Sequence, residues 1–166
     1  MAIEPVNVRL ATEADLPAIR RIYNEGIVDR VATLDLDEKD DADIRAWWTN
    51  HDDRFAVLVA ERGRAVTGWA SINRYSQRCA YEGVADLLIY IAREARGGGV
   101  GRLLMEALEA AAVERGFHKM VLFTFAFNAA AQRLYKGRGF REVGTFRNQG
   151  KLDGRDVDVM AMEKLF

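Results

Sequence analysis

The sequence predicts a single domain, residues 1–166, of the α/β (α+β) class, in which helices flank one mixed sheet. The length of 166 residues is that of one domain, and we find no linker, internal repeat or low-complexity segment. The composition is 49% hydrophobic and 30% charged with only 2 prolines, which is typical of a soluble chain that buries a sizeable core. Strand-like and helix-like periodicities alternate in the order β-α-α-β-β-β-α-β-α-β-β.

The N-terminal part predicts one strand and one helix. Residues 6–10 alternate apolar and polar side chains, as a half-buried strand does. A helix-start signal follows at residues 12–15, and Pro17 fits the first turn. The helix is predicted to run to about Asp29 because apolar residues recur at helical spacing, namely Leu16, Ile19, Ile22, Tyr23 and Ile27.

An acidic stretch predicts the start of a second helix. Asp40, Asp41 and Asp43 place carboxylates where they complement the helix dipole. Ile44, Trp47 and Trp48 supply its buried stripe. These two tryptophans and Trp69 are interpreted first as core, with the alternative that one of them walls a substrate pocket.

The middle of the chain predicts a hairpin and a central strand. Residues 55–61 and 65–73 are β-prone, and Arg62-Gly63-Arg64 turns the chain between them into an antiparallel hairpin. Residues 83–91 are apolar on both faces, which is typical of a central strand, and Asp86 lies in its middle.

The second half predicts two helices and three strands. A glycine-rich turn leads into a helix with Gly116 at its C-terminal cap, followed by a strand over residues 118–126. A helix over residues 128–138 ends at Gly139, and two strands cover residues 140–146 and 155–165.

Charge and cysteine content exclude several function classes. Basic and acidic residues number 24 and 25, a net charge of -1 without a lysine-rich tract, so we expect neither nucleic acid nor a membrane as partner. The one cysteine, Cys79, has no disulfide partner, and neither a signal peptide nor a membrane-spanning segment is recognised, so a cytoplasmic location is expected. His51 and His118 lie too far apart to suggest a zinc signature, and no metal is expected.

The glycine-rich turn from Arg96 to Gly101 carries the most chemical information. Backbone N–H groups at a helix N-terminus cradle phosphate. The turn is not a Walker loop, because Gly101 is followed by Arg102 and Leu103 instead of lysine and a hydroxyl residue. The G-x-G-x-x-G spacing of dinucleotide-binding loops also fails. A ligand-free turn is the alternative if this loop is taken alone.

Two motifs together resemble the GCN5-related N-acetyltransferase (GNAT) family. Arg96, Gly99 and Gly101 form its R-x-x-G-x-G loop, and Asn128, Ala131, Leu134 and Tyr135, followed by Gly139-Phe140, form its N-x-x-A-x-x-L-Y…G-F signature. The resemblance covers essentially the whole chain. It implies a GNAT fold, a mostly antiparallel twisted sheet of about seven strands with about four helices, in which strands 4 and 5 splay apart around the pantetheine arm of acetyl-CoA. It also implies a homodimer.

Shorter segments resemble one branch of that family. Residues 9–16, 22–25 and 32–33 are similar to phosphinothricin and methionine sulfoximine acetyltransferases, and residues 81–86, 116–119 and 150–154 to the arsinothricin branch. The sequence departs from the phosphinothricin enzymes at two places and from the common loop pattern at a third. Ala85-Asp86-Leu87 replaces Val-Glu-His, Tyr135 replaces a frequent histidine, and Gly98 replaces a frequent arginine.

The resemblance assigns roles to particular residues. Asp86 aligns with the catalytic glutamate and would act as general base, with a pKa raised by desolvation; the alternative is that it only ties down the loop before it. Tyr135 would protonate the leaving sulfur, or is core. Asn128 binds the cofactor, caps its helix, or does both. The cofactor-binding set is Ile89, Tyr90, Ile91, Arg96, Gly97, Gly98, Gly99, Val100, Gly101, Arg102 and Asn128.

The expected function is acetyl-CoA-dependent N-acetylation of a small glutamate-like amino acid. A second acidic group on this acceptor requires cations, and the candidates are Arg74, Arg78, Lys151 and Arg155, which we expect on loops near the open face of the sheet. Taken singly, each is as well explained as a surface cation. The alternatives are N-acetylation of a peptide N-terminus or a polyamine, and a catalytically silent acyl-CoA-binding module.

Overall fold

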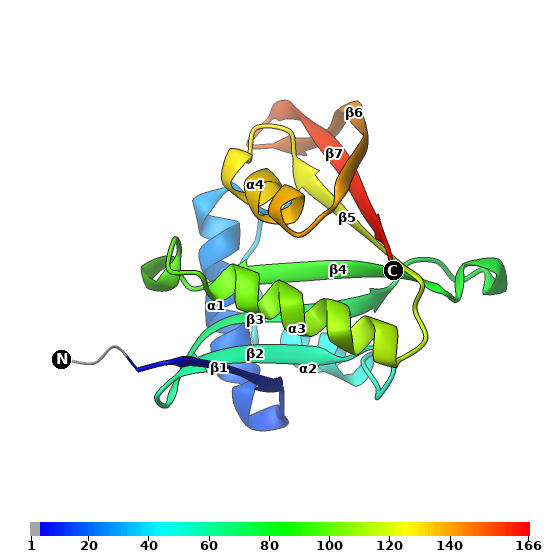
Figure 1. The fold of residues 1–166 in the computed structure, drawn as a ribbon. Helices are drawn as coiled ribbons and strands as arrows, with labels where there is room; N and C mark the ends of the chain where they lie inside the picture. The colour runs from blue at the N-terminus through cyan, green and yellow to red at the C-terminus, as the bar shows by residue number, and fades with distance from the viewer. Residues whose placement is uncertain (1–3) are drawn as a thin grey trace.

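The computed structural model describes residues 4–166. It contains one seven-stranded sheet in the order β1-β2-β3-β4-β5-β7-β6, with helices on both faces (Figure 1). The strands are β1 (Val6–Leu10), β2 (Val57–Arg62), β3 (Ala65–Arg74), β4 (Val84–Ile91), β5 (Lys119–Phe125), β6 (Arg141–Leu152) and β7 (Arg155–Leu165). The helices are α1 (Leu16–Asp29), α2 (Asp41–Thr49), α3 (Val100–Glu114) and α4 (Ala129–Gly137). The predicted mixed α/β fold is confirmed.

The helices form two layers around the sheet. In Figure 1, α3 and α4 lie in front of the strands, while α1 and α2 lie behind them. The core contains fully buried side chains from both layers, among them Ile19 and Ile22 of α1 and Leu104 and Leu108 of α3. Their burial removes apolar surface from water on each face and fixes the helices to the sheet.

The start of α2 follows the predicted signal. Asp40 caps the helix by accepting a hydrogen bond from the backbone N–H of Asp43, and the Asp43 carboxylate accepts one from the N–H of Asp40. The predicted buried stripe is wrong in part. Ile44 is buried, whereas Trp47 and Trp48 are half-buried and pack against the core from a helix whose main neighbour is α1.

Strands β4 and β5 are parallel neighbours that separate after three paired residues. The register runs from Val84↔Lys119 through Ala85↔Met120 to Asp86↔Val121. Beyond this point the two strands diverge toward α4, as Figure 1 shows, while β4 stays paired with β3 along its other edge. The predicted splaying of strands 4 and 5 is confirmed.

The last hairpin is longer than the sequence predicts. The strand predicted over residues 140–146 continues to Leu152, with register shifts between Glu142 and Gly144 and between Phe146 and Gly150. Its exposed residues lack clear alternation, so periodicity does not show the extension. Backbone hydrogen bonds to β7 hold this extension as a strand without an alternating side-chain pattern.

Among residues 4–166, no helix is long and apolar enough to cross a membrane.

Candidate active site

A cavity of about 490 Å³ lies in the opening between β4 and β5. It collects residues from β4, the glycine-rich turn, α3 and α4, which are far apart in the sequence. The predicted cofactor residues that line it are Ile89, Tyr90, Ile91, Arg96, Gly97, Gly99, Val100, Gly101, Arg102 and Asn128, and Tyr135 lines it as well. Gly98 belongs to the same turn but does not line the cavity.

Glycine is required in this turn by backbone conformation and by space. Gly97 and Gly99 have φ of 75° and 83°, a left-handed region that residues with a Cβ rarely adopt. Gly99 is the N-terminal cap of α3, so the unpaired N–H groups of the first helical turn face the cavity side. A Cβ on Gly101 would lie 3.1 Å from Leu134 Cδ2. The turn is therefore built as an anion cradle.

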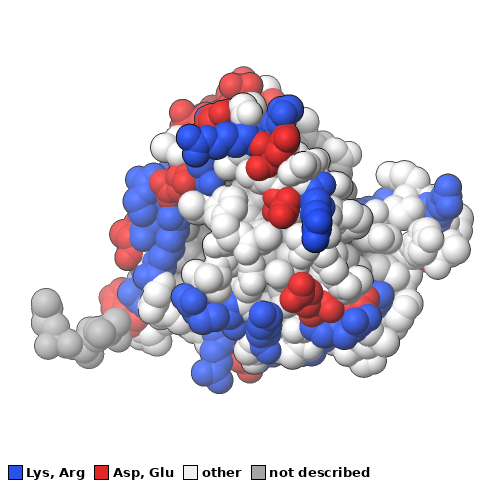
Figure 2. All heavy atoms as spheres, turned by 90° about the horizontal axis from the view of Figure 1, so that it is seen from above, with Lys and Arg blue, Asp and Glu red and all other residues white. Residues whose placement is uncertain are grey.

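Arginines supply positive charge around this cradle. Arg96, Arg102 and Arg133 line the cavity and are exposed to solvent. Within residues 4–166, Arg102 and Arg133 form no ion pair, while Arg96 pairs with Asp29. Figure 2 shows that on the face seen from above, basic and acidic side chains are intermixed, so this face has no continuous basic surface. The positive charge available to a bound anion therefore comes from the arginines on the cavity wall.

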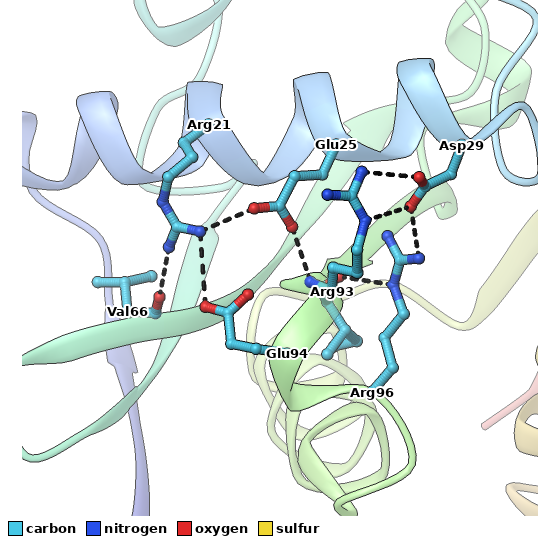
Figure 3. A network of polar contacts seen from close by, with 8 residues as sticks. Arg21, Glu25, Asp29, Val66, Arg93, Glu94 and Arg96 are labelled. Carbon is cyan, nitrogen blue, oxygen red and sulfur yellow. Dashed lines mark hydrogen bonds and ion pairs between the residues drawn. The ribbon is translucent and has the colours of Figure 1, made fainter.

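An ion-pair cluster fixes the segment that precedes the glycines (Figure 3). Asp29 of α1 accepts hydrogen bonds from the guanidinium groups of Arg93 and Arg96, at 2.7 Å and 2.6 Å. The Glu25 carboxylate accepts a 2.7 Å bond from the backbone N–H of Arg93, and Arg96 Nε donates to the Ile91 carbonyl at 3.2 Å. These guanidinium groups lower the pKa of the Asp29 carboxyl, with Arg93 the larger cause. We call this cluster the α1 clamp.

Asp86 is a titratable group near the cavity whose pKa is shifted toward neutrality. It is the last β4 residue paired with β5. Burial raises the pKa of its carboxyl to about 7, and a hydrogen bond from the backbone N–H of Leu87 offsets part of this effect. A carboxylate with a pKa near neutrality can exchange a proton during a reaction at physiological pH.

Tyr135 of α4 faces the same region from the opposite wall. Its side chain is buried, and burial together with the charge of Asp86 raises the pKa of the phenol. The phenol is therefore a neutral hydroxyl at physiological pH, able to donate a proton or a hydrogen bond. Its ring also packs against Phe140, with ring centroids 6.2 Å apart. Packing and the proposed acid role are thus compatible.

Asn128 connects two walls of the cavity. Its side-chain oxygen accepts a 3.1 Å hydrogen bond from the N–H of Ala131, so it caps α4 as predicted. Its Nδ2 donates to the Val31 carbonyl at 2.9 Å, which ties the segment after α1 to the start of α4. A role in cofactor binding stays a prediction.

The divergence of the strands leaves part of β4 unpaired on one side. Among residues 4–166, the edge of β4 that faces β5 pairs with no strand from Leu87 to Ile91, and the Ile91 carbonyl accepts a hydrogen bond from the Arg96 side chain. An unpaired strand edge inside a protein binds an extended chain that carries amide groups. The cavity therefore offers backbone hydrogen bonds as well as an anion cradle.

The predicted acceptor cations do not meet at this cavity. Their expected location on loops is wrong for three of them, because Arg74 ends β3, Lys151 lies in β6 and Arg155 begins β7. Arg74 stacks over Phe55 at 4.9 Å, and Lys151 pairs with Asp156 at 2.8 Å. Arg78 precedes a short 3-10 helix and is exposed. Contact of any of them with substrate stays a prediction.

Sequence reasoning missed several residues of the cavity wall. Val31 and Ala32 reach it from the segment after α1, Phe123 and Thr124 from β5, and Arg133 from α4. A signal was available for Arg133, which lies between Gln132 and Leu134 inside the second motif, and for Ala32, which lies in the segment 32–33 that resembles the branch. The others reach the wall through tertiary packing.

The residues present fit the CoA part of acetyl-CoA. The glycine cradle and arginines suit a pyrophosphate, the unpaired β4 edge suits the amides of pantetheine, and the cavity continues to Tyr135. Among residues 4–166, no group of three or more His, Cys, Asp or Glu side chains is arranged to hold a metal ion.

Comparison with known proteins places the chain in a family. Residues 16–140 match the "Acetyltransferase (GNAT) family". The L-methionine sulfoximine/L-methionine sulfone acetyltransferase of Pseudomonas aeruginosa is 31% identical over 95% of this chain and 92% of its own length.

Two crystal structures show the same fold. The ribosomal-protein-alanine N-acetyltransferase of Brucella melitensis has a TM-score of 0.93 at 37% identity, covering 96% of this chain and 99% of that one. A phosphinothricin acetyltransferase of Sinorhizobium meliloti, in complex with AcCoA, has a TM-score of 0.92 at 28% identity, covering 97% and 88%. The chain is therefore an N-acetyltransferase and belongs to the Acetyltransferase (GNAT) family.

Proposed function

We propose that the protein transfers the acetyl group of acetyl-CoA to the α-amino group of a small glutamate-like amino acid of the phosphinothricin, methionine sulfoximine or arsinothricin type. One observation carries the proposal. A half-buried carboxylate, Asp86, has a pKa raised to about 7 by desolvation and lies where β4 and β5 separate, next to a cavity that it does not itself line and that ends in an anion cradle. A base and a cofactor site thus share one strand.

Asp86 removes a proton from the acceptor amine. An amine must lose a proton to attack a thioester carbonyl, and a base with a pKa near the working pH is effective in this role. The nitrogen lone pair forms the new C–N bond, and the proton passes to the Asp86 carboxylate. Because aspartate is one methylene shorter than the glutamate it aligns with, we propose that a water relays this proton.

The remaining groups act on the thioester, which acetyl-CoA supplies. Backbone N–H groups along the unpaired edge from Ile89 to Ile91 stabilise the negative charge that develops on the carbonyl oxygen. When the tetrahedral intermediate collapses, the C–S bond breaks and the Tyr135 phenol protonates the departing sulfur. The α1 clamp and the glycine turn hold the loop that binds the pyrophosphate.

Relatives support the amino-acid class of acceptor. The Pseudomonas aeruginosa protein is named for methionine sulfoximine and methionine sulfone, and the Sinorhizobium meliloti protein for phosphinothricin. A second candidate is acetylation of a peptide N-terminus. The Brucella melitensis structure, titled a ribosomal-protein-alanine N-acetyltransferase, is the observation that favours it.

Release of the CoA thiol across a panel of acceptors tests the proposal. The panel holds phosphinothricin, methionine sulfoximine, arsinothricin, a polyamine and an alanine-initiated peptide. We expect turnover with amino acids to exceed turnover with the polyamine and the peptide. Faster reaction with the peptide would support the second candidate. Acetyl-CoA binding in calorimetry without thiol release from any acceptor would instead indicate a silent binding module.

A further inference from the structure

A second cavity, of about 270 Å³, lies on the other face of the sheet between α1 and α2. Aromatic rings form much of its wall. Trp47 and Trp69 meet edge to face with ring centroids 5.2 Å apart, Tyr23 lies 6.0 Å from Trp69, and Leu88 of β4 completes this side. The volume is small for a cofactor site and suits the side chain of one amino acid.

Trp69 contributes a hydrogen-bond donor that has no partner. The residue is 2% exposed, and its indole Nε1–H meets no acceptor among residues 4–166. A buried donor without a partner costs about 1–3 kcal/mol, so nearly all buried donors in proteins are paired. Because this tryptophan lines the cavity, a bound hydrogen-bond acceptor would satisfy the donor.

The cavity adjoins the proposed base along β4. Asp86, Leu88 and Tyr90 alternate on the strand, so their side chains project from the same face at intervals of about 7 Å. Leu88 lines the second cavity, whereas Tyr90 lines the cofactor cavity and stacks on Trp69 at 5.1 Å. The proposed base and the second cavity therefore lie along the same face of β4.

The charges around this cavity disfavour an anion. Its ionisable wall residues other than Tyr23 are two aspartates, Asp35 and Asp43, and one lysine, Lys39. The Lys39 ammonium lies 3.6 Å from the Asp35 carboxylate, which also accepts a hydrogen bond from the Tyr23 hydroxyl. The one positive charge is thus already paired. A second carboxylate, Asp43, remains at the exposed rim of the cavity, and its negative charge disfavours another anion beside it.

We propose that this cavity binds the side chain of the acceptor amino acid, and that Trp69 Nε1–H donates a hydrogen bond to an uncharged oxygen or nitrogen on that side chain. The enzyme therefore prefers acceptors with uncharged, hydrogen-bond-accepting side chains to acceptors with anionic ones. The proposal rests on the proposed function, because the amine of the same molecule must lie at Asp86. Trp69 is a specificity-determining residue in this arrangement. The charged acceptors of the proposed class become the poorer substrates.

Two substrate ratios test the inference. The first is kcat/KM for methionine sulfone over kcat/KM for methionine, which differ in the sulfone oxygens. We expect it to exceed about tenfold in the wild type and to fall by about tenfold in Trp69→Phe, which keeps an aromatic ring but lacks the N–H. Since each ratio is taken within one variant, a reduced folded fraction cancels. The second ratio, glutamine over glutamate, should exceed one.

Trp48→Phe is the matched control, since Trp48 lies in the same helix as Trp47 but does not line the cavity. It should leave the sulfone ratio unchanged. The inference is overturned if Trp69→Phe leaves that ratio intact, or if glutamate reacts faster than glutamine. Failure of the proposed function gives a different result, with no amino acid acetylated while an N-terminal peptide is. Calorimetry with methionine sulfone, without acetyl-CoA, should show weaker binding to Trp69→Phe than to Trp48→Phe.

Discussion

Asp86 and Val121 form the last backbone pair between β4 and β5, and the two strands separate directly after them. The half-buried carboxylate therefore lies at the apex of the opening that holds the proposed cofactor site. The pKa of Asp86 therefore depends on where the strands separate, because the packing of β4 against β5 at this point shields the Asp86 carboxyl from water.

The stability of Asp86→Asn relative to the wild type should depend on pH. The pKa of Asp86 is about 7 in the folded protein and 3.8 in an unperturbed chain, so as the pH rises the unfolded state loses this proton first. The wild type therefore loses stability relative to the asparagine variant between about pH 4 and pH 7. Urea unfolding at pH 4, 5.5 and 8 should show a growing advantage for Asp86→Asn.

Asp37→Asn is the control for this series, because Asp37 is exposed and forms no ion pair among residues 4–166. A stability difference between Asp86→Asn and the wild type that stays constant over the pH range would contradict the raised pKa. A loss of stability in Asp86→Asn at every pH would show that the carboxylate stabilises the fold through its contacts.

The α1 clamp should determine how well the cofactor loop is ordered. Asp29→Asn removes the charge that both Arg93 and Arg96 contact, so amide hydrogen exchange in residues 92–99 should accelerate. We expect the KM for acetyl-CoA to rise about threefold to tenfold with little change in kcat, because loop ordering is then required on binding. Unchanged exchange together with unchanged KM would show that the clamp has no such role.

The glycine cradle should tolerate no acidic side chain. In Gly101→Glu a Cβ lies 3.1 Å from Leu134 Cδ2, and a negative charge enters the proposed phosphate site. The KM for acetyl-CoA should rise by about tenfold or more. Gly137→Glu is the matched control, because a Cβ at this position of α4 meets no atom within 4 Å. Equal KM values in the two folded variants would remove the turn from the cofactor site.

Tyr135→Phe separates the hydroxyl from the ring. The variant keeps packing against Phe140 but cannot protonate a thiolate, so kcat should fall by about tenfold to a hundredfold with KM for acetyl-CoA nearly constant. The decisive comparison uses an acetyl thioester of lower thiol pKa, which needs less protonation. If the variant recovers no activity with that donor, the tyrosine acts only through packing.

Local patterns predict most of the fold and the cofactor loop. The apolar run around Asp86 indicates a central strand. The glycine turn can be predicted because left-handed backbone just before a helix N-terminus requires glycine. For the second cavity the sequence offers only the alternative that a tryptophan walls a pocket, since Trp69 and Lys39 meet only after β3 and the segment after α1 have packed together. The α1 clamp likewise joins Asp29 to Arg93 across 64 residues. Contacts between residues so far apart leave no periodic pattern in the sequence.

The pH dependence of kcat/KM in Asp86→Asn decides whether Asp86 is the general base. Asparagine keeps the size of the side chain but cannot accept a proton, so kcat/KM should fall by about 10²-fold or more at neutral pH, while acetyl-CoA affinity barely changes. The wild-type profile should rise through an apparent pKa near 7, and the variant should lack this limb and recover partly at high pH. Glu82→Gln, at an exposed site just before β4, should behave as the wild type. Near-wild-type turnover by Asp86→Asn at neutral pH would contradict the account.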